Sequence, residues 1–191
     1  MSESLRRSFL YGWAQTLLFF GLNRAALQAF RDVVRENPSH AEAWRVLGYL
    51  HAQRNELSEA VPAFEKALAL RTHDAELFFN AGFVVQRAGN HSRAMELMQQ
   101  AIALNANLDR AWYGLGLSLA RVGRYEEAVA KFREAARLQP FNPYAGYHLA
   151  AALAKLGRHD EVIREYLRVK KFDPKVSALM RRELEIEERG G

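Results

Sequence analysis

The stretch from Asp109 to Asn142 reads DRAWYGLGLSLARVGRYEEAVAKFREAARLQPFN. When it is numbered from one, positions 4, 7, 8, 11, 20, 24, 27 and 32 hold Trp112, Leu115, Gly116, Leu119, Ala128, Phe132, Ala135 and Pro140. Positions 4, 8 and 11 lie three or four residues apart, as do positions 20, 24 and 27. Each set therefore falls on one face of a helix. The stretch predicts two amphipathic helices.

The ends of these two helices are marked by a glycine and a proline. Gly123, at position 15, stands where the first helix must stop, and glycine adopts the left-handed terminating conformation without steric penalty. Pro140 pushes the residue before it out of the helical region and so ends the second helix. Between the helices, the small residues Gly116 and Ala128 would let the two axes approach to about 8–10 Å. The stretch thus predicts a tight helical hairpin.

The same spacing recurs every 34 residues in both directions, at residues 7–40, 41–74, 75–108 and 143–176. Position 15 is the most informative of the series, because it should be left-handed in every repeat. It is occupied by Gly21, Asn55, Gly89, Gly123 and Gly157. Asparagine is among the non-glycine residues that best tolerate left-handed backbone. Five repeats in register therefore cover residues 7–176.

A 34-residue hairpin with this signature resembles the tetratricopeptide repeat (TPR) family. The resemblance implies an all-α, right-handed α-α superhelical solenoid of five TPR helix pairs. It also implies one domain over residues 1–191, because each hairpin buries its apolar face only against its neighbours. Residues 177–188 have a partly apolar side and are expected to form a C-terminal capping helix. Members of this family act as non-catalytic protein-binding scaffolds, and the same is expected here.

Three departures from the pattern carry structural expectations. Thr72 and Ala106 replace the proline at position 32, so the helices before them are expected to run further. Pro62 is tolerated only near a helix start, which puts that start near Leu57–Ser58. His51 occupies an apolar position and is interpreted as a core histidine, in preference to a ligand.

The run Ser8–Leu22, SFLYGWAQTLLFFGL, follows two arginines and has the apolar character of a signal-peptide core. It also keeps the repeat register, including Gly21, and no clean cleavage site follows it. We therefore interpret it as the first helix of the first repeat. Its apolar excess makes self-association through this helix the alternative function, with a homo-oligomer as the product.

A second stripe runs along the first helix of each repeat, through positions 2, 5, 6, 9, 12 and 13. Packing within a hairpin does not require it, and the TPR resemblance implies that it lines a concave groove. The residues expected to bind a ligand there are Tyr11, Arg45, Tyr49, Phe79, Asn80, Phe83, Arg87, Arg110, Tyr113, Arg121, Tyr147 and His148. Tyrosine and arginine often dominate binding energy at interfaces. The expected partner is a protein or peptide segment with apolar anchors and acidic residues. The alternative is that these side chains fill the inner wall of a tightly wound solenoid.

One TPR subclass grips a terminal carboxylate with basic and asparagine side chains. Arg45, Asn80 and Arg110 match parts of that clamp, whereas Tyr49 and Gly114 depart from it. The sequence therefore leaves a carboxylate-clamp mode open.

Other chemistries receive little support from the sequence. The net charge of +5 is spread over many turns, so nucleic acid is an unlikely partner even though the chain is basic. The histidines lack the i, i+4 spacing of a helical metal site, and no glycine-rich phosphate loop is present. We expect no enzyme activity, no cofactor and no metal. The lack of cysteine excludes disulfides and leaves the compartment undetermined, with the cytoplasm as the expected location.

Overall fold

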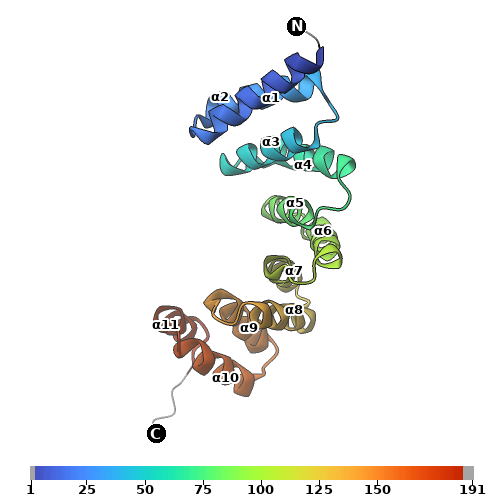
Figure 1. Ribbon diagram of the computed structural model, residues 1–191. Coiled ribbons are helices and arrows are strands. Elements are labelled where there is room, and N and C mark those ends of the chain that lie inside the picture. The colour runs from blue at the N-terminus through green and yellow to red at the C-terminus, as the bar shows by residue number, and fades with distance from the viewer. Residues whose placement is uncertain (1–2, 187–191) are drawn as a thin grey trace. The chain divides into compact units, whose positions relative to one another are not determined.

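The computed structural model describes residues 3–186, and within that range the chain is all-α, as expected, with no strand. Ten helices follow one another in five consecutive pairs, and an eleventh comes after them (Figure 1). The helices are α1 (Glu3–Phe19), α2 (Asn23–Glu36), α3 (Ala41–Gln53), α4 (Leu57–Leu70), α5 (Ala75–Arg87), α6 (His91–Leu104), α7 (Asp109–Arg121), α8 (Tyr125–Leu138), α9 (Pro143–Lys155), α10 (His159–Lys170) and α11 (Pro174–Glu183).

The chain forms two compact units, Met1–Asn90 and His91–Gly191, which are described separately. In the first unit, α1 packs on α2, α2 on α3, α3 on α4 and α4 on α5. In the second unit, α6 to α10 follow the same rule, and α11 packs on both α9 and α10. Contacts between sequence neighbours are the arrangement expected of a repeat protein. The assignment of residues 1–191 to a single array stays a prediction.

The predicted turn residues all adopt the left-handed conformation. The φ angles are 70° at Gly21, 59° at Asn55, 87° at Gly89, 81° at Gly123 and 71° at Gly157. After α7, for example, the amide of Arg124 donates to the Leu119 carbonyl at 2.9 Å, and that of Gly123 donates to Ala120 at 3.1 Å. This pair of bonds is the Schellman arrangement that closes a helix end. The five turns are confirmed.

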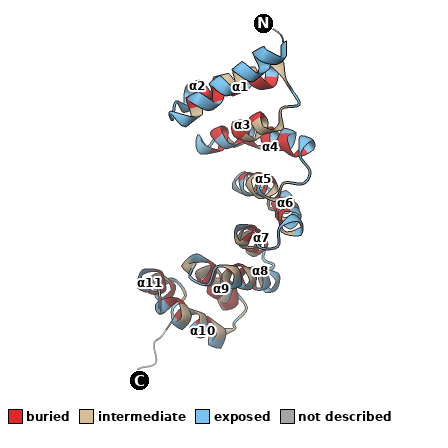
Figure 2. Cartoon of the chain, in the orientation of Figure 1, coloured by how far each residue is buried: buried red, intermediate tan, exposed pale blue. Residues whose placement is uncertain are grey.

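The small residue at position 8 makes room for an aromatic ring from the second helix. A Cβ placed on Gly116 would lie 2.6 Å from the ring of Phe132, and one on Gly48 would lie 2.7 Å from the ring of Phe64. We expected Gly116 to face Ala128; the structure instead puts a fully buried Phe132 over it. Figure 2 shows buried residues on the sides where the helices of each unit face one another. The missing side chain at Gly48 and Gly116 therefore leaves room for the rings of Phe64 and Phe132 from the second helix of each pair.

His51 is a core residue, as the sequence analysis indicated. It is 5% exposed, and its Nδ1 lies 2.7 Å from Oε2 of Glu56. Hydrogen bonds from Arg54 and His51 lower the pKa of Glu56. The carboxylate thus satisfies a polar ring that would otherwise be costly to bury.

The expected extension of two helices is wrong. α4 ends at Leu70 and α6 ends at Leu104. Each is 14 residues long, the same length as α8, which precedes Pro140. Local side chains end these helices without a proline. Asp74 accepts from the amide of Leu77 at 3.0 Å and so starts the next helix, as N-caps do. After α6, Asn105 Oδ1 accepts from the amide of Asn107 at 3.0 Å and forms a turn.

Two further boundaries were expected from the sequence, and one is confirmed. α4 begins at Leu57, as expected, but Pro62 lies beyond the first turn of the helix. Because proline has no N–H, the carbonyl of the exposed residue Ser58 lacks its helical donor. α11 begins at Pro174, earlier than the expected residue 177, because Asp173 caps it by accepting from the amide of Val176 at 2.9 Å. It ends at Glu183, short of residue 188, which lies outside the described residues.

The apolar run near the N-terminus is helical, since α1 includes most of it. Among the residues that the structure describes, no helix has the length and apolar character needed to cross a membrane. Only Ala14 and Leu17 of α1 are buried.

Candidate functional site

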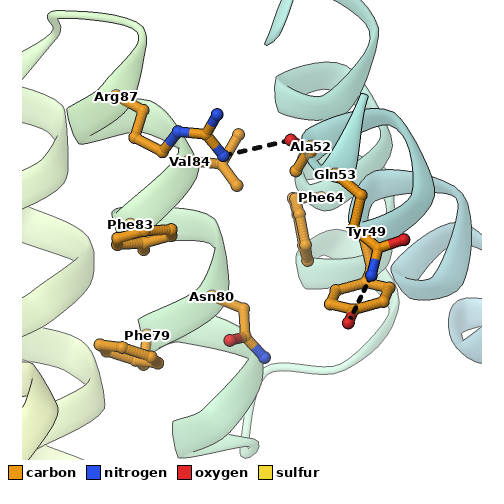
Figure 3. Close-up of a pocket in the computed structure, with 9 residues that line it drawn as sticks. All are labelled: Tyr49, Ala52, Gln53, Phe64, Phe79, Asn80, Phe83, Val84 and Arg87. Carbon is orange, nitrogen blue, oxygen red and sulfur yellow. Dashed lines mark hydrogen bonds between the residues drawn. The ribbon is translucent and has the colours of Figure 1, made fainter. Parts of the chain in front are cut away.

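The first unit contains a pocket of about 340 Å³ between α3 and α5, with a side chain of α4 at its base (Figure 3). Five residues of the predicted binding stripe line it, from positions 5, 6, 9 and 13 of their repeats: Tyr49, Phe79, Asn80, Phe83 and Arg87. The remaining lining residues are Ala52, Gln53, Phe64 and Val84. The helical spacing that defines the stripe thus brings side chains from two repeats to one cavity.

Aromatic rings form the walls of this pocket. Phe79 and Phe83 lie one helical turn apart on α5, with ring centroids 6.4 Å apart and planes inclined by 25°. Across the pocket stands Tyr49, and Phe64 is buried between the two sides. Tyr49 and Phe83 remain 51% and 45% exposed. An apolar group entering here would cover ring surface that now faces water, which is favourable by about 25 cal/mol per Å².

Arg87 closes the end of the pocket nearest the C-terminus of α3. Its Nη1 donates to the Ala52 carbonyl at 3.1 Å and its Nη2 to Asn55 Oδ1 at 2.8 Å. The guanidinium carbon also lies 5.8 Å from the centroid of the Phe83 ring. These contacts hold the cation in place without neutralising it, because no carboxylate within residues 3–186 pairs with it. The pocket therefore has a fixed positive charge at one end.

Two side-chain amides supply the polar part of the lining. Gln53 Nε2 donates to the hydroxyl of Tyr49 at 2.7 Å and so orients that ring. Asn80 points into the space between α3 and α5 (Figure 3), and its amide makes no hydrogen bond to another described residue. An amide in this state can both donate to and accept from an incoming backbone.

Tyr11 and Arg45, also predicted to bind, lie outside the pocket in the first unit. The Tyr11 ring lies 4.3 Å from that of His40 and 6.1 Å from that of Phe30. Burial and then the charge of Glu42 raise the pKa of Tyr11. Arg45 donates from Nε to Oε2 of Glu42 at 2.9 Å, and this bond raises the pKa of Arg45. The charge of Arg45 is thus already balanced within the chain.

The second unit gathers three predicted residues, Tyr113, Tyr147 and His148, in one cluster of rings that includes the core residue Phe132. His148 lies 5.6 Å from Tyr113, 5.8 Å from Phe132 and 4.9 Å from Tyr147, measured between ring centroids. Burial raises the pKa of Tyr113 to about 12 and lowers the pKa of His148. The hydroxyl of Tyr147 donates to Glu183 of α11, and this bond is the largest cause of the raised pKa of Tyr147. The capping helix therefore engages part of the predicted stripe.

The other two predicted residues of the second unit, Arg110 and Arg121, are exposed at the two ends of α7. Neither belongs to the ring cluster around His148. Within the described part of the chain, no group of three or more His, Cys, Asp or Glu side chains could hold a metal ion.

Four pocket residues were absent from the predicted set: Ala52, Gln53, Phe64 and Val84. Gln53 could have been found, because it stands at position 13, where Arg87 was selected one repeat later. Phe64 was assigned to the core, and it also forms the pocket base. No periodic signal distinguishes these two roles for one ring.

The sequence and fold of the chain match known proteins. A profile described as "Tetratricopeptide repeat" matches residues 11–75, 84–143 and 116–176, which together exceed half of the chain. A stretch of 54 residues, 28% of this chain, is 41% identical to the "Formate-dependent nitrite reductase complex subunit NrfG" of Escherichia coli O157:H7. The match spans only 27% of that relative's length.

Solved structures with the same fold cover nearly the whole chain. A structure of MamA has a TM-score of 0.83 and 20% identity, over 96% of this chain and 98% of that one. YrrB, "a TPR protein with an unusual peptide-binding site", has a TM-score of 0.82 and 22% identity, over 91% and 90%. Pseudomonas aeruginosa pilF has a TM-score of 0.76 and 20% identity, over 95% and 84%. At these identities the likeness establishes the fold alone.

Proposed function

This chain belongs to the tetratricopeptide repeat family, and from that premise we propose that it is a non-catalytic protein-binding scaffold. Its first unit takes a side chain of a partner peptide into the pocket between α3 and α5. One observation carries this proposal: five residues selected as ligand-facing from their repeat positions line a single cavity. YrrB, which has a similar fold, is described as having a peptide-binding site.

The lining of the pocket favours a particular kind of segment. The walls of Tyr49, Phe79 and Phe83 suit an apolar or aromatic anchor, whose burial contributes about 1.5–3 kcal/mol. Asn80 is in position to bond the backbone beside that anchor. Arg87 favours an acidic residue at the end of the pocket nearest α3, as a charge complement. The proposed ligand is therefore a peptide with an apolar anchor next to an acidic residue.

The stripe of the second unit is proposed as a separate partner-binding surface. Arg110, Tyr113 and Arg121 are the residues proposed for this role. Tyr147 is available to a partner only after its bond to Glu183 is released.

The test uses peptides selected from a random library on the full-length chain. Their dissociation constants are then measured by fluorescence anisotropy with the double variant Tyr49→Ala/Phe83→Ala. Both rings are about half exposed, so the variant should fold normally. We expect the peptides to bind about tenfold more weakly or worse. The control is Phe141→Ala, which removes a 78% exposed ring outside the pocket and should leave binding unchanged. Equal binding by the double variant would remove the pocket from the mechanism.

A second function, self-assembly through α1, is favoured by a separate observation. Large apolar side chains are exposed on α1 and the turn after it: Leu5, Phe9, Trp13, Phe19, Phe20 and Leu22. A chain that associates through them should become monomeric when Phe9 and Trp13 are both replaced by glutamate. Sedimentation velocity over a concentration series measures this. A wild-type chain that is monomeric throughout would eliminate the second function and leave the first intact.

A further inference from the structure

The helix α1 has two apolar faces, and only one of them is covered within the chain. Leu10, Ala14 and Leu17 face α2. A second, exposed face carries residues at three- and four-residue spacing, which aligns them along the helix. This outer stripe consists of Leu5, Phe9, Gly12, Trp13, Thr16 and Phe19, and it continues into Phe20 of the following turn.

The exposed apolar surface of the stripe approaches the size of one side of a protein–protein interface. The exposed fractions of the five large side chains of the stripe, Leu5, Phe9, Trp13, Phe19 and Phe20, lie between 52% and 85%. Taking roughly 200 Å² for a large side chain, they expose roughly 670 Å². A standard interface covers about 800 Å² per partner, and the largest apolar patch of a typical monomer is about 300–600 Å². The stripe therefore exposes more apolar area than the largest patch of a typical monomer and approaches one side of a standard interface.

Gly12, in the middle of this stripe, has no role in packing within the chain. A Cβ placed on it would meet no atom within 4 Å, and its φ is not one that favours glycine. A glycine inside a helix is destabilising relative to alanine. The hydroxyl of Thr16, one turn later, donates to the Gly12 carbonyl at 2.9 Å. The centre of the stripe is thus small, and its polar group is satisfied without water.

The charges beside the stripe suit a second copy of the same chain. Arg6 bonds Glu36 at 2.6 Å, and Arg7 bonds Glu3 at 2.7 Å. Arg6 lies beside the outer stripe and is balanced by a carboxylate of its own chain; Arg7, also paired, lies on the other side of the helix. Two identical faces can therefore approach without like-charge repulsion at their edges.

We propose that two copies pair through α1, with the helices crossing at Gly12 of each chain. This inference rests on the second function proposed above. The interface is isologous, because the same patch serves both partners. The absence of a side chain at Gly12 lets the axes approach to the lower end of the 8–10 Å range. Phe9 and Trp13 then pack against the partner on either side of the crossing.

The test adds apolar surface at the crossing point and asks whether association weakens. Gly12→Leu should fold normally, since a Cβ there meets no atom within 4 Å and leucine is a better helix former. Sedimentation velocity should give a dimer dissociation constant raised by about tenfold or more. Gln28→Leu adds the same group to an exposed position on α2 and should leave the dimer unchanged. Circular dichroism verifies the helix content of both.

A cross-link gives an independent readout, because the natural chain has no cysteine. Gly12→Cys should form a disulfide-linked dimer under mild oxidation, since the two Cα atoms must lie within about 7 Å for the bond to form. Gln28→Cys should not. A dimer that is lost with Phe9→Glu but unaffected by Gly12→Leu would overturn the crossing while leaving self-assembly in place. A monomeric wild-type chain would overturn both.

Discussion

Arg87 donates a hydrogen bond from Nη2 to Oδ1 of Asn55, 2.8 Å away, although 32 residues separate them. Position 15 is left-handed in all five repeats, and Asn55 is the only residue there that is not glycine. Its φ is 59°. Its side chain therefore has a function that glycine could not provide. A turn in one repeat is tied to the pocket-lining arginine of the next.

Replacement of Asn55 separates the backbone contribution from that of the hydrogen bond. Asn55→Ala removes the acceptor and puts a less tolerant residue at left-handed φ, so we expect the free energy of unfolding to fall by roughly 1–2 kcal/mol. Asn55→Gly also removes the acceptor but relieves the backbone, and the net change should be under about 1 kcal/mol. Urea denaturation measures both. The hydrogen bond is tested by combining Asn55→Gly with Arg87→Ala, where strictly additive effects would contradict coupling.

The two glycines of α7 that face neighbouring helices should differ in their tolerance of a methyl group. At Gly116 a Cβ meets the ring of the fully buried Phe132 at 2.6 Å, so Gly116→Ala should destabilise the chain by roughly 1–3 kcal/mol. At Gly114 it meets the terminal methyl of Met98 at 2.7 Å, and methionine adapts readily. Gly114→Ala should therefore be close to neutral, within roughly 1 kcal/mol. If thermal denaturation shows equal losses of stability in Gly116→Ala and Gly114→Ala, the rigidity of the Phe132 ring does not explain the expected difference.

Some features of this structure could be predicted from the sequence, and others could not. The turns were predictable because left-handed backbone is a local property, and glycine or asparagine every 34 residues reports it directly. Five pocket residues were predictable because helical spacing fixes which side chains share a face.

Contacts between repeats were not predictable in the same way. Periodicity gives no distance between Arg87 and Asn55, and it does not indicate that Glu183 would reach Tyr147. The helix ends near Thr72 and Ala106 were missed for a related reason: capping by Asp74 and a turn at Asn105 substitute for the proline. Individual side-chain bonds of this kind carry no repeat signature.

The partly buried imidazole of His148 should make the second unit less stable in mild acid. Burial lowers the pKa of His148, so the unfolded state, with a histidine pKa near 6.5, binds a proton more readily than the folded state. The contribution of His148 to the free energy of unfolding is therefore fully present above about pH 6.5. It is lost as the pH drops through the lower folded-state pKa. His148→Phe keeps an aromatic ring among its aromatic neighbours but removes the titrating group, so it should reduce the dependence of stability on pH. Thermal melts between about pH 5 and pH 8 measure it. Unchanged pH dependence in the variant would assign the effect to another group.

The bond from Tyr147 to Glu183 should control how firmly α11 covers the last repeat. Tyr147→Phe removes the donor but keeps the ring, and since the bond is exposed we expect α11 docking to weaken by only roughly 0.5–1 kcal/mol. Hydrogen exchange by mass spectrometry should show faster exchange in α11 with no change in α7. Glu183→Gln is the matched variant and should have a smaller effect, because its amide still accepts a hydrogen bond.

The same bond predicts the behaviour of α11 at high pH. The bond to Glu183, then burial, raise the pKa of Tyr147, so its contribution is fully present below the unfolded tyrosine pKa of about 10. It is lost as the pH rises through the folded-state pKa, when two anions would face each other. Protection of α11 should therefore be constant from neutral pH to about pH 10 and fall above it. In Tyr147→Phe this fall should be absent; if it persists there, the loss of protection comes from another titrating group.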